Sequence, residues 1–128
     1  CHCVTPHIAG HSLEGKMRGT YMIYKNFCEH FGLDASHQLG NLIPQPDLSF
    51  LQVSPAATAK EVLAQACGSV YPLMEDNARM HEGNDFDLLR KNYPIRREFS
   101  SLQLHGMTNT DATTMMSGLG FDISHETP

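Results

Sequence analysis

The stretch Leu48-Ser-Phe-Leu-Gln-Val53, followed by Thr58-Ala-Lys-Glu61, decides the fold of this chain. Residues 48–53 combine apolar and aromatic side chains in a short run, which is typical of a strand. Thr58 and Glu61 have the spacing of a capping box, in which each side chain bonds to the backbone N–H of the other residue. The stretch therefore predicts a strand followed by a helix, and Pro72 is expected to end that helix.

The sequence after Pro72 continues with helices and strands. These later elements are a helix from Asn84 or Asp85 to Tyr93, a half-buried strand at residues 102–104, a helix starting at Asn109 or Thr110, and a strand at residues 121–123. The pattern of residues 73–83 is ambiguous: it is compatible with a further short helix followed by a turn at Gly83. The order from residue 48 onward is strand, helix, helix, strand, helix, strand, so the predicted fold class is α/β, as a small α/β sandwich.

Residues 12–32 predict one long amphipathic helix. Ser12 is a suitable N-cap, Glu14 lies in the first turn where a carboxylate meets the positive end of the helix dipole, and Gly32 is a natural C-terminal residue. Apolar residues recur at three- and four-residue steps along it: Leu13, Met17, Tyr21, Tyr24, Cys28 and Phe31. We interpret this broad apolar face as a packing surface for the rest of the protein.

Residues 34–47 predict a linker, because Pro44 and Pro46 forbid a regular helix or a central strand. The linker divides the chain into residues 1–33, which contain the long helix, and residues 48–128, which form the small α/β domain.

The composition excludes several classes of protein. With 41% hydrophobic and 18% charged residues the 128-residue chain is an ordinary globular sequence. A formal charge of −5 argues against a nucleic acid or an anionic membrane as the main partner. No apolar run approaches the roughly 18 residues of a membrane span, and no secretory signal is visible, so we expect a cytoplasmic protein with its four cysteines as thiols.

A metal site is an alternative for the first residues of the chain. Potential zinc ligands gather there: Cys1, His2, Cys3, His7 and His11. Against a metal, Cys-x-Cys is tighter than the usual spacing in zinc fingers, and Pro6 and Gly10 disfavour a continuous helix across the two later histidines. We therefore expect no metal.

The turn Thr5-Pro-His-Ile-Ala-Gly-His-Ser-Leu-Glu-Gly-Lys16 resembles the catalytic-histidine turn of the D-2-hydroxyacid dehydrogenases. Other strings extend the resemblance over nearly the whole chain: Leu42-Ile-Pro-Gln-Pro46, Phe86-Asp-Leu-Leu-Arg-Lys-Asn-Tyr93, Arg96-Arg-Glu-Phe-Ser-Ser-Leu102 and Leu119-Gly-Phe121. Together they are similar to the C-terminal third of the family members that act on 4-phosphoerythronate.

This resemblance implies a cytoplasmic, NAD-dependent homodimer that oxidises the 2-hydroxyl of 4-phosphoerythronate to a keto group in pyridoxal phosphate biosynthesis. It implies that His7 is catalytic, that Gly10 lies at the cofactor, and that residues 48–128 form a C-terminal dimerisation domain. Residues 1–33 would then belong to upstream domains, which also hold the glutamate and arginine partners of His7. Because the chain has no Gly-x-Gly-x-x-Gly loop, we expect it to be the C-terminal piece of a larger enzyme, with the Rossmann domain absent from this chain.

General chemistry agrees with the role of His7. Hydride removal from a secondary alcohol requires a base for the hydroxyl proton, and imidazole, with a reference pKa of about 6.5, suits that task near neutrality.

A basic cluster also needs an explanation: Arg90, Lys91, Arg96 and Arg97. It is either a solvated or interface-lining face, or Arg96 or Arg97 meets the substrate phosphate across a dimer interface. The alternative function is a stand-alone dimerisation module in which His7 is catalytically idle.

Overall fold

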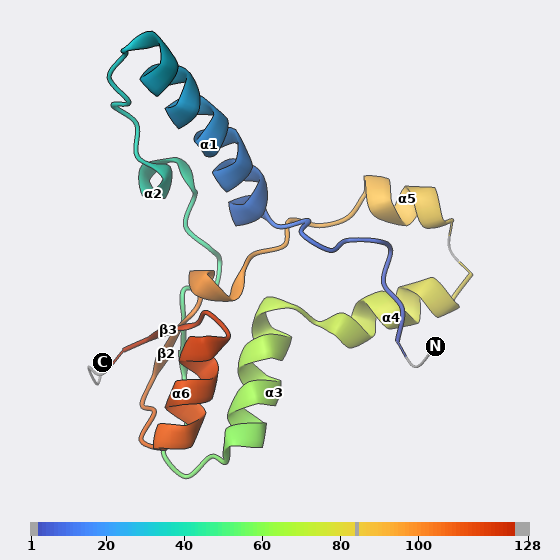
Figure 1. Ribbon diagram of the computed structural model, residues 1–128. Coiled ribbons are helices and arrows are strands. Elements are labelled where there is room, and N and C mark those ends of the chain that lie inside the picture. The colour runs from blue at the N-terminus through green and yellow to red at the C-terminus, as the bar shows by residue number, and fades with distance from the viewer. Residues whose placement is uncertain (1–2, 84, 125–128) are drawn as a thin grey trace.

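The computed structural model describes residues 3–83 and 85–124. The elements are α1 (Leu13–Phe31), α2 (Leu39–Leu42), β1 (Phe50–Gln52), α3 (Ala59–Val70), α4 (Leu73–His81), α5 (Phe86–Lys91), a 3-10 turn (Phe99–Ser101), β2 (Gln103–His105), α6 (Thr110–Gly118) and β3 (Asp122–Ile123). Figure 1 shows three parts: the sheet with α3 and α6, a second lobe with α4, α5 and the N-terminal segment, and α1, which projects away from both with α2 beside it.

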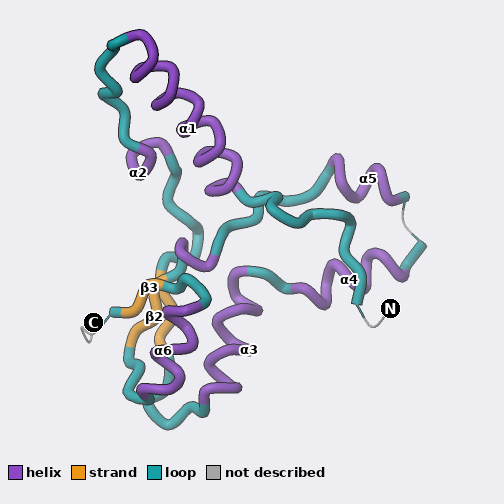
Figure 2. The backbone as a smooth tube through the Cα atoms, viewed as in Figure 1, coloured by secondary structure: helices purple, strands orange, loops and turns teal. Residues whose placement is uncertain are grey.

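The three strands form a parallel sheet in the order β1-β2-β3. Leu51 pairs with Leu104, and Leu104 pairs with Ile123, so β2 is the central strand. The first crossover contains α3, α4 and α5 and the second contains α6, as parallel neighbours require. The predicted α/β class is confirmed, and Figure 2 shows how small the strand content is beside the helices.

The apolar core lies between one face of this sheet and the pair α3 and α6, which pack against each other. Its buried members are Val53, Val62, Ala66, Leu102, Leu104, Met116 and Phe121. The other face of the sheet is more polar and stays largely uncovered, with Phe50 52% exposed and its ring against His105. Parallel sheets are usually covered on both faces, so this open face is unusual.

The predicted helix caps are confirmed. Thr58 and Glu61 form both halves of the capping box at the start of α3. Asp85 accepts hydrogen bonds from the first turn of α5, and Asn109 accepts one from the N–H of Ala112 at the start of α6. Asn84, the alternative cap for α5, lies outside the described residues.

Three predicted elements differ from the structure in detail. Residues 73–83, left open by the sequence, contain the nine-residue helix α4, which ends before Gly83 with its φ of 74°. The strand predicted at residues 48–53 is shorter, although Ser49 and Val53 still bond to β2 through their backbones. The linker contains the single helical turn α2 before Pro44, because a proline excludes helix only at and just before its own position.

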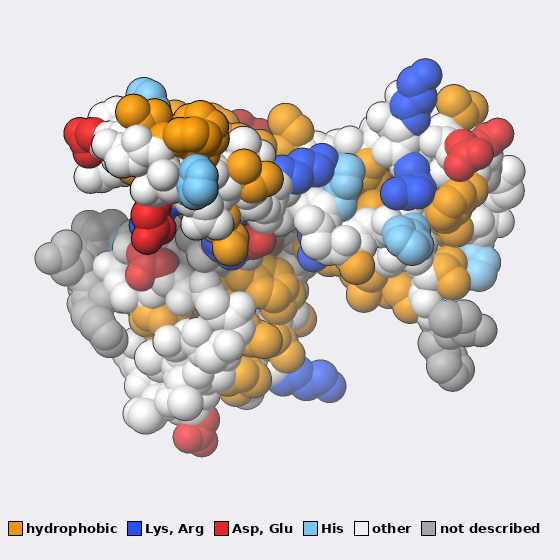
Figure 3. All heavy atoms as spheres, turned by 45° about the horizontal axis from the view of Figure 1, so that its top comes forward, with side chains coloured by type: hydrophobic (Ala, Val, Ile, Leu, Met, Phe, Trp, Pro, Cys, Tyr) orange, Lys and Arg blue, Asp and Glu red, His pale blue; other side chains and the backbone are white. Residues whose placement is uncertain are grey.

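The long helix α1 has the predicted boundaries. The Ser12 side chain caps it, and Gly32 ends it in the left-handed conformation with a φ of 64°. Much of its apolar face is uncovered, including Met22, Ile23, Phe27 and Phe31. Hydrophobic side chains accordingly lie exposed over α1 at the upper left of Figure 3.

Candidate active site

The His7 turn, residues 5–11, leads into α1. His7 has a φ of 56°, a left-handed conformation that is uncommon for a residue other than glycine. Its N–H donates to the carbonyl of Thr5 at 2.8 Å, and the N–H of His11 donates to the carbonyl of Ile8 at 2.9 Å. Ile8 is buried, whereas the His7 side chain is exposed. The turn is therefore anchored by Ile8 and presents the imidazole of His7 at the surface.

Segment 94–98, which follows α5, lies against the start of α1. The backbone N–H of Leu13 donates to the carbonyl of Arg96 at 2.9 Å. The Ser12 hydroxyl accepts a hydrogen bond from Gly15 and donates one to Glu98 at 2.9 Å. The first turn of α1 is thus bonded to a segment more than 80 residues later in the chain.

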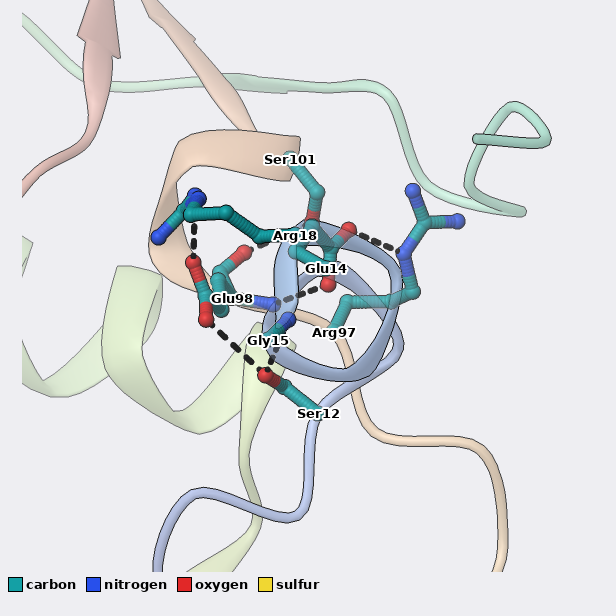
Figure 4. A network of polar contacts seen from close by, with 7 residues as sticks. All are labelled: Ser12, Glu14, Gly15, Arg18, Arg97, Glu98 and Ser101. Atoms are coloured by element: carbon teal, nitrogen blue, oxygen red, sulfur yellow. Dashed lines mark hydrogen bonds and ion pairs between the residues drawn. The ribbon is translucent and has the colours of Figure 1, made fainter. Parts of the chain in front are cut away.

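Glu14 is the centre of the polar network shown in Figure 4. Glu14 is 5% exposed, and its carboxylate accepts hydrogen bonds from Arg97 Nε at 2.6 Å and from the Glu98 backbone N–H at 3.0 Å. Arg18 of α1 reaches Glu98 at 3.3 Å. Buried charges require such pairing, so these contacts determine how α1 sits on segment 94–98.

Arg96 contacts the His7 turn directly. Its Nη1 donates to the carbonyl of Ile8 at 3.3 Å, and its guanidinium stacks 4.2 Å from the centre of the Tyr71 ring. Its buried Nε has no hydrogen-bond partner among the residues that the structure describes. A stacked guanidinium is held by its face, which leaves Nη1 to bond to the turn.

Asp76 of α4 is a buried acid that contacts Tyr71, the residue on which Arg96 stacks. It is 4% exposed, and one carboxylate oxygen accepts hydrogen bonds from Tyr71 at 2.9 Å and from Tyr93 at 2.6 Å. Burial and the bond to Asp76 raise the pKa of Tyr71 to about 12, and the same causes raise the pKa of Tyr93. Both tyrosines therefore stay protonated donors to a higher pH than an unperturbed tyrosine does.

The structure brings the predicted site residues to one region but gives them different environments. His7 is open to solvent, and Gly10 has a φ of 70° with no described heavy atom within 4 Å of where a Cβ would lie. Arg96 bonds to the His7 turn, and Arg97 pairs with Glu14. Whether either arginine meets a substrate phosphate stays a prediction.

Sequence reasoning missed Asp76 and Glu98 as members of this region. Neither residue stands in a motif that signals burial, and each finds its partners only through tertiary contacts. The one available signal for Asp76 was a tyrosine just before α4 and another after α5, which is too common a pattern to interpret from sequence alone.

Within residues 3–83 and 85–124, no three histidine, cysteine or acidic side chains lie close enough together to bind a metal ion. His11 instead lies beside Tyr93 and Lys16. Cys1 and His2 lie outside the described residues, while Cys28 and Cys67 are free cysteines, as predicted. The described helices also include none with both the length and the apolar character to cross a membrane.

Comparison with known proteins decides the family. Residues 42–120 match the family described as a domain of unknown function, DUF3410. The chain belongs to this family. The match starts in the predicted linker and covers β1, β2, α3 to α6 and segment 94–98, but neither β3 nor the His7 turn.

Individual relatives match a larger share of the chain. The chain is 43% identical to an erythronate-4-phosphate dehydrogenase of Tolumonas auensis over 94% of its own length. Enzymes with the same name from Stutzerimonas stutzeri and Proteus mirabilis are 41% and 37% identical over 94% and 95% of the chain. The chain spans about a third of the length of these curated relatives, 32–34%. The resemblance to the C-terminal portion of this oxidoreductase is confirmed.

Proposed function

We propose that this chain is the C-terminal part of an NAD-dependent erythronate-4-phosphate dehydrogenase, in which His7 is the acid–base residue. The observation that carries the proposal is the exposed imidazole on a turn tied to α1, within a chain similar to these enzymes over more than nine-tenths of its length. The reaction would convert 4-phospho-D-erythronate to 2-oxo-3-hydroxy-4-phosphobutanoate, a step that serves pyridoxal phosphate biosynthesis.

The chemistry asked of His7 is proton transfer. The imidazole takes the proton of the 2-hydroxyl as the C2–H bond breaks and a keto group forms, and it returns that proton in the reverse direction. NAD, when bound, accepts the hydride from C2 and becomes NADH. The backbone at Gly10 is open enough for contact with that cofactor, whereas a glycine loop for its pyrophosphate does not occur in this sequence.

We also infer that the partner is a second copy of the same protein, associating through residues 48–128. Two features support this inference: the outer face of the sheet is open at Phe50, and β1 and β3 each have one edge without a neighbouring strand in the described part of the chain. Uncovered sheet surface of this kind is normally paired or covered. We also propose that the protein is cytoplasmic, because the resemblance to erythronate-4-phosphate dehydrogenases implies that location.

The test is NADH formation in the full-length protein that carries this chain. With 4-phosphoerythronate and NAD the enzyme should form NADH, and His7→Asn should lower kcat by roughly 100- to 10,000-fold with NAD affinity nearly unchanged. The 128-residue chain alone should be silent. Normal turnover in His7→Asn would refute the role of His7, and activity of the isolated chain would refute the need for upstream domains.

A second function is favoured by the family match, which leaves out the His7 turn. In that case the chain would be a stand-alone dimerisation module. Its sheet domain, which consists of β1, β2, β3, α3 and α6 around a closed core, would be sufficient for association. The mass of the polypeptide made in the cell distinguishes the two: a product near 14.2 kDa supports the module, and a product about three times larger supports the enzyme.

A further inference from the structure

We propose that Arg96 is a positioning residue for His7, so that the C-terminal domain contributes to catalysis as well as to association. The inference rests on the proposed function of His7, although its structural half can be tested without any activity. In this proposal Arg96 bonds to the turn that carries the imidazole and does not bind the substrate phosphate.

The first observation is that Arg96 bonds to both sides of the turn after His7. Its carbonyl accepts the N–H of Leu13 at 2.9 Å, and its Nη1 donates to the carbonyl of Ile8 at 3.3 Å. One residue therefore bridges the residue next to His7 and the first residue of α1. Ser12, which lies between them, is bonded in addition to Glu98.

The second observation is that Arg96 itself is held in place. Its guanidinium stacks on the ring of Tyr71, whose hydroxyl donates to the buried carboxylate of Asp76. Tyr93, three residues before Arg96, donates to the same carboxylate oxygen. Arg79 lies 3.6 Å from the other oxygen of Asp76. The chain of contacts thus runs from α4 through Tyr71 to Arg96 and on to the turn.

The third observation is that His7 depends on its backbone for its position. A non-glycine residue in the left-handed region persists only where the surrounding structure determines it, and the exposed imidazole has little packing of its own. The bond to Ile8 fixes the residue that directly follows His7, and the bond to Leu13 fixes the far end of the same turn, so both restrain the backbone on which His7 depends. An acid–base group displaced by about 1 Å loses on the order of 100-fold in rate, so such support has a catalytic consequence.

The structural test uses the 128-residue chain and NMR. A left-handed His7 gives a strong nuclear Overhauser effect between its own amide and α protons. Arg96→Met should weaken this signal and change the amide chemical shifts of residues 7–11. The amide chemical shifts of β1 and β2 should be unchanged, which would show that the domain is folded. Tyr71→Leu, which removes the stacked ring and leaves Arg96 intact, should produce a smaller change of the same kind. Lys60→Met removes one exposed positive charge on α3 and serves as the control.

The kinetic test uses the full-length enzyme. Arg96→Met should lower kcat by about 10- to 100-fold and leave KM for 4-phosphoerythronate within about twofold, because the imidazole and not the substrate has moved. Arg96→Lys, which can still donate to Ile8, should recover part of the loss, and Lys60→Met should behave as the wild type.

The outcomes separate the proposals. An unchanged His7 signal in Arg96→Met overturns the positioning role, whatever the kinetics show. A raised KM with unchanged kcat also overturns it and assigns Arg96 to substrate binding. If the wild-type enzyme does not oxidise 4-phosphoerythronate but the His7 signal depends on Arg96, the structural role stands and the proposed function fails.

Discussion

The sheet domain and the His7 region of this chain are held together by different kinds of contact. The sheet domain has a closed apolar core, in which Leu104 and Met116 have no exposed surface. The His7 region is tied down by charged and polar groups such as Glu14 and Arg97, while the apolar face of α1 stays open. From this difference we expect the sheet domain to keep its fold alone, and α1 to be well protected only where another surface covers its exposed face.

The largest effect is expected from a substitution in the core of the sheet domain. Leu104→Ala removes a fully buried side chain from the central strand and should lower the free energy of unfolding by about 2–5 kcal/mol. Leu33→Ala, just after α1, removes the same side chain where it is 56% exposed and should cost less than about 0.5 kcal/mol. Urea unfolding of both variants measures the difference. Equal losses would mean that the α1 region has a core of its own.

Amide exchange should show the same contrast without any substitution. In the isolated chain, amides in the middle of α1, around Ile23, should exchange on the order of 100-fold faster than those of Val62 and Ala66 in α3, because an uncovered helix opens locally. Hydrogen exchange followed by NMR gives both rates in one sample. Equal protection of α1 and α3 would break the comparison.

A third measurement concerns the open face of the sheet. The chain should sediment as a dimer at tens of micromolar, and Phe50→Glu, which places a charge on that face, should weaken association by about tenfold or more. Phe27→Glu on the exposed face of α1 is the matched control and should leave the dissociation constant unchanged. The reverse result would assign the dimer interface to α1.

The smallest effect is expected at alkaline pH. The pKa of Tyr71 is raised to about 12 in the folded chain, so between pH 10 and 12 the unfolded chain loses a proton that the folded chain keeps. Stability should therefore fall as the pH rises through this range. Tyr71→Phe should flatten that slope, with Tyr21→Phe on α1 as the control. A slope that is the same in both variants would show that burial and the bond to Asp76 do not keep Tyr71 protonated.

Local signals in the sequence predicted most of the elements. Caps such as Ser12, Thr58 and Asn109 act within one helical turn, and each caps the expected helix. The α/β class follows from the order of these elements. The exceptions are short or irregular: residues 73–83 lack a side-chain cap, and the turn α2 precedes two prolines.

The candidate site divides in the same way. His7 was predicted from the resemblance of the string around it to the catalytic-histidine turn of a known enzyme family. The partners of that turn could not be predicted. Arg96 and Glu98 come from more than 80 residues away, and a basic cluster in a sequence does not reveal whether its members face a ligand or the chain itself.

The sequence by itself therefore determined the capped helices and the α/β class, since these depend on residues a few positions apart, and its resemblance to a known family pointed to the histidine turn. Only the tertiary structure decided the parallel order of the strands, the open face at Phe50 and the burial of Asp76 and Glu14. The physical reason is that hydrogen bonds within a turn are set by local backbone angles. Burial and ion pairing instead depend on which distant segments the apolar core brings together.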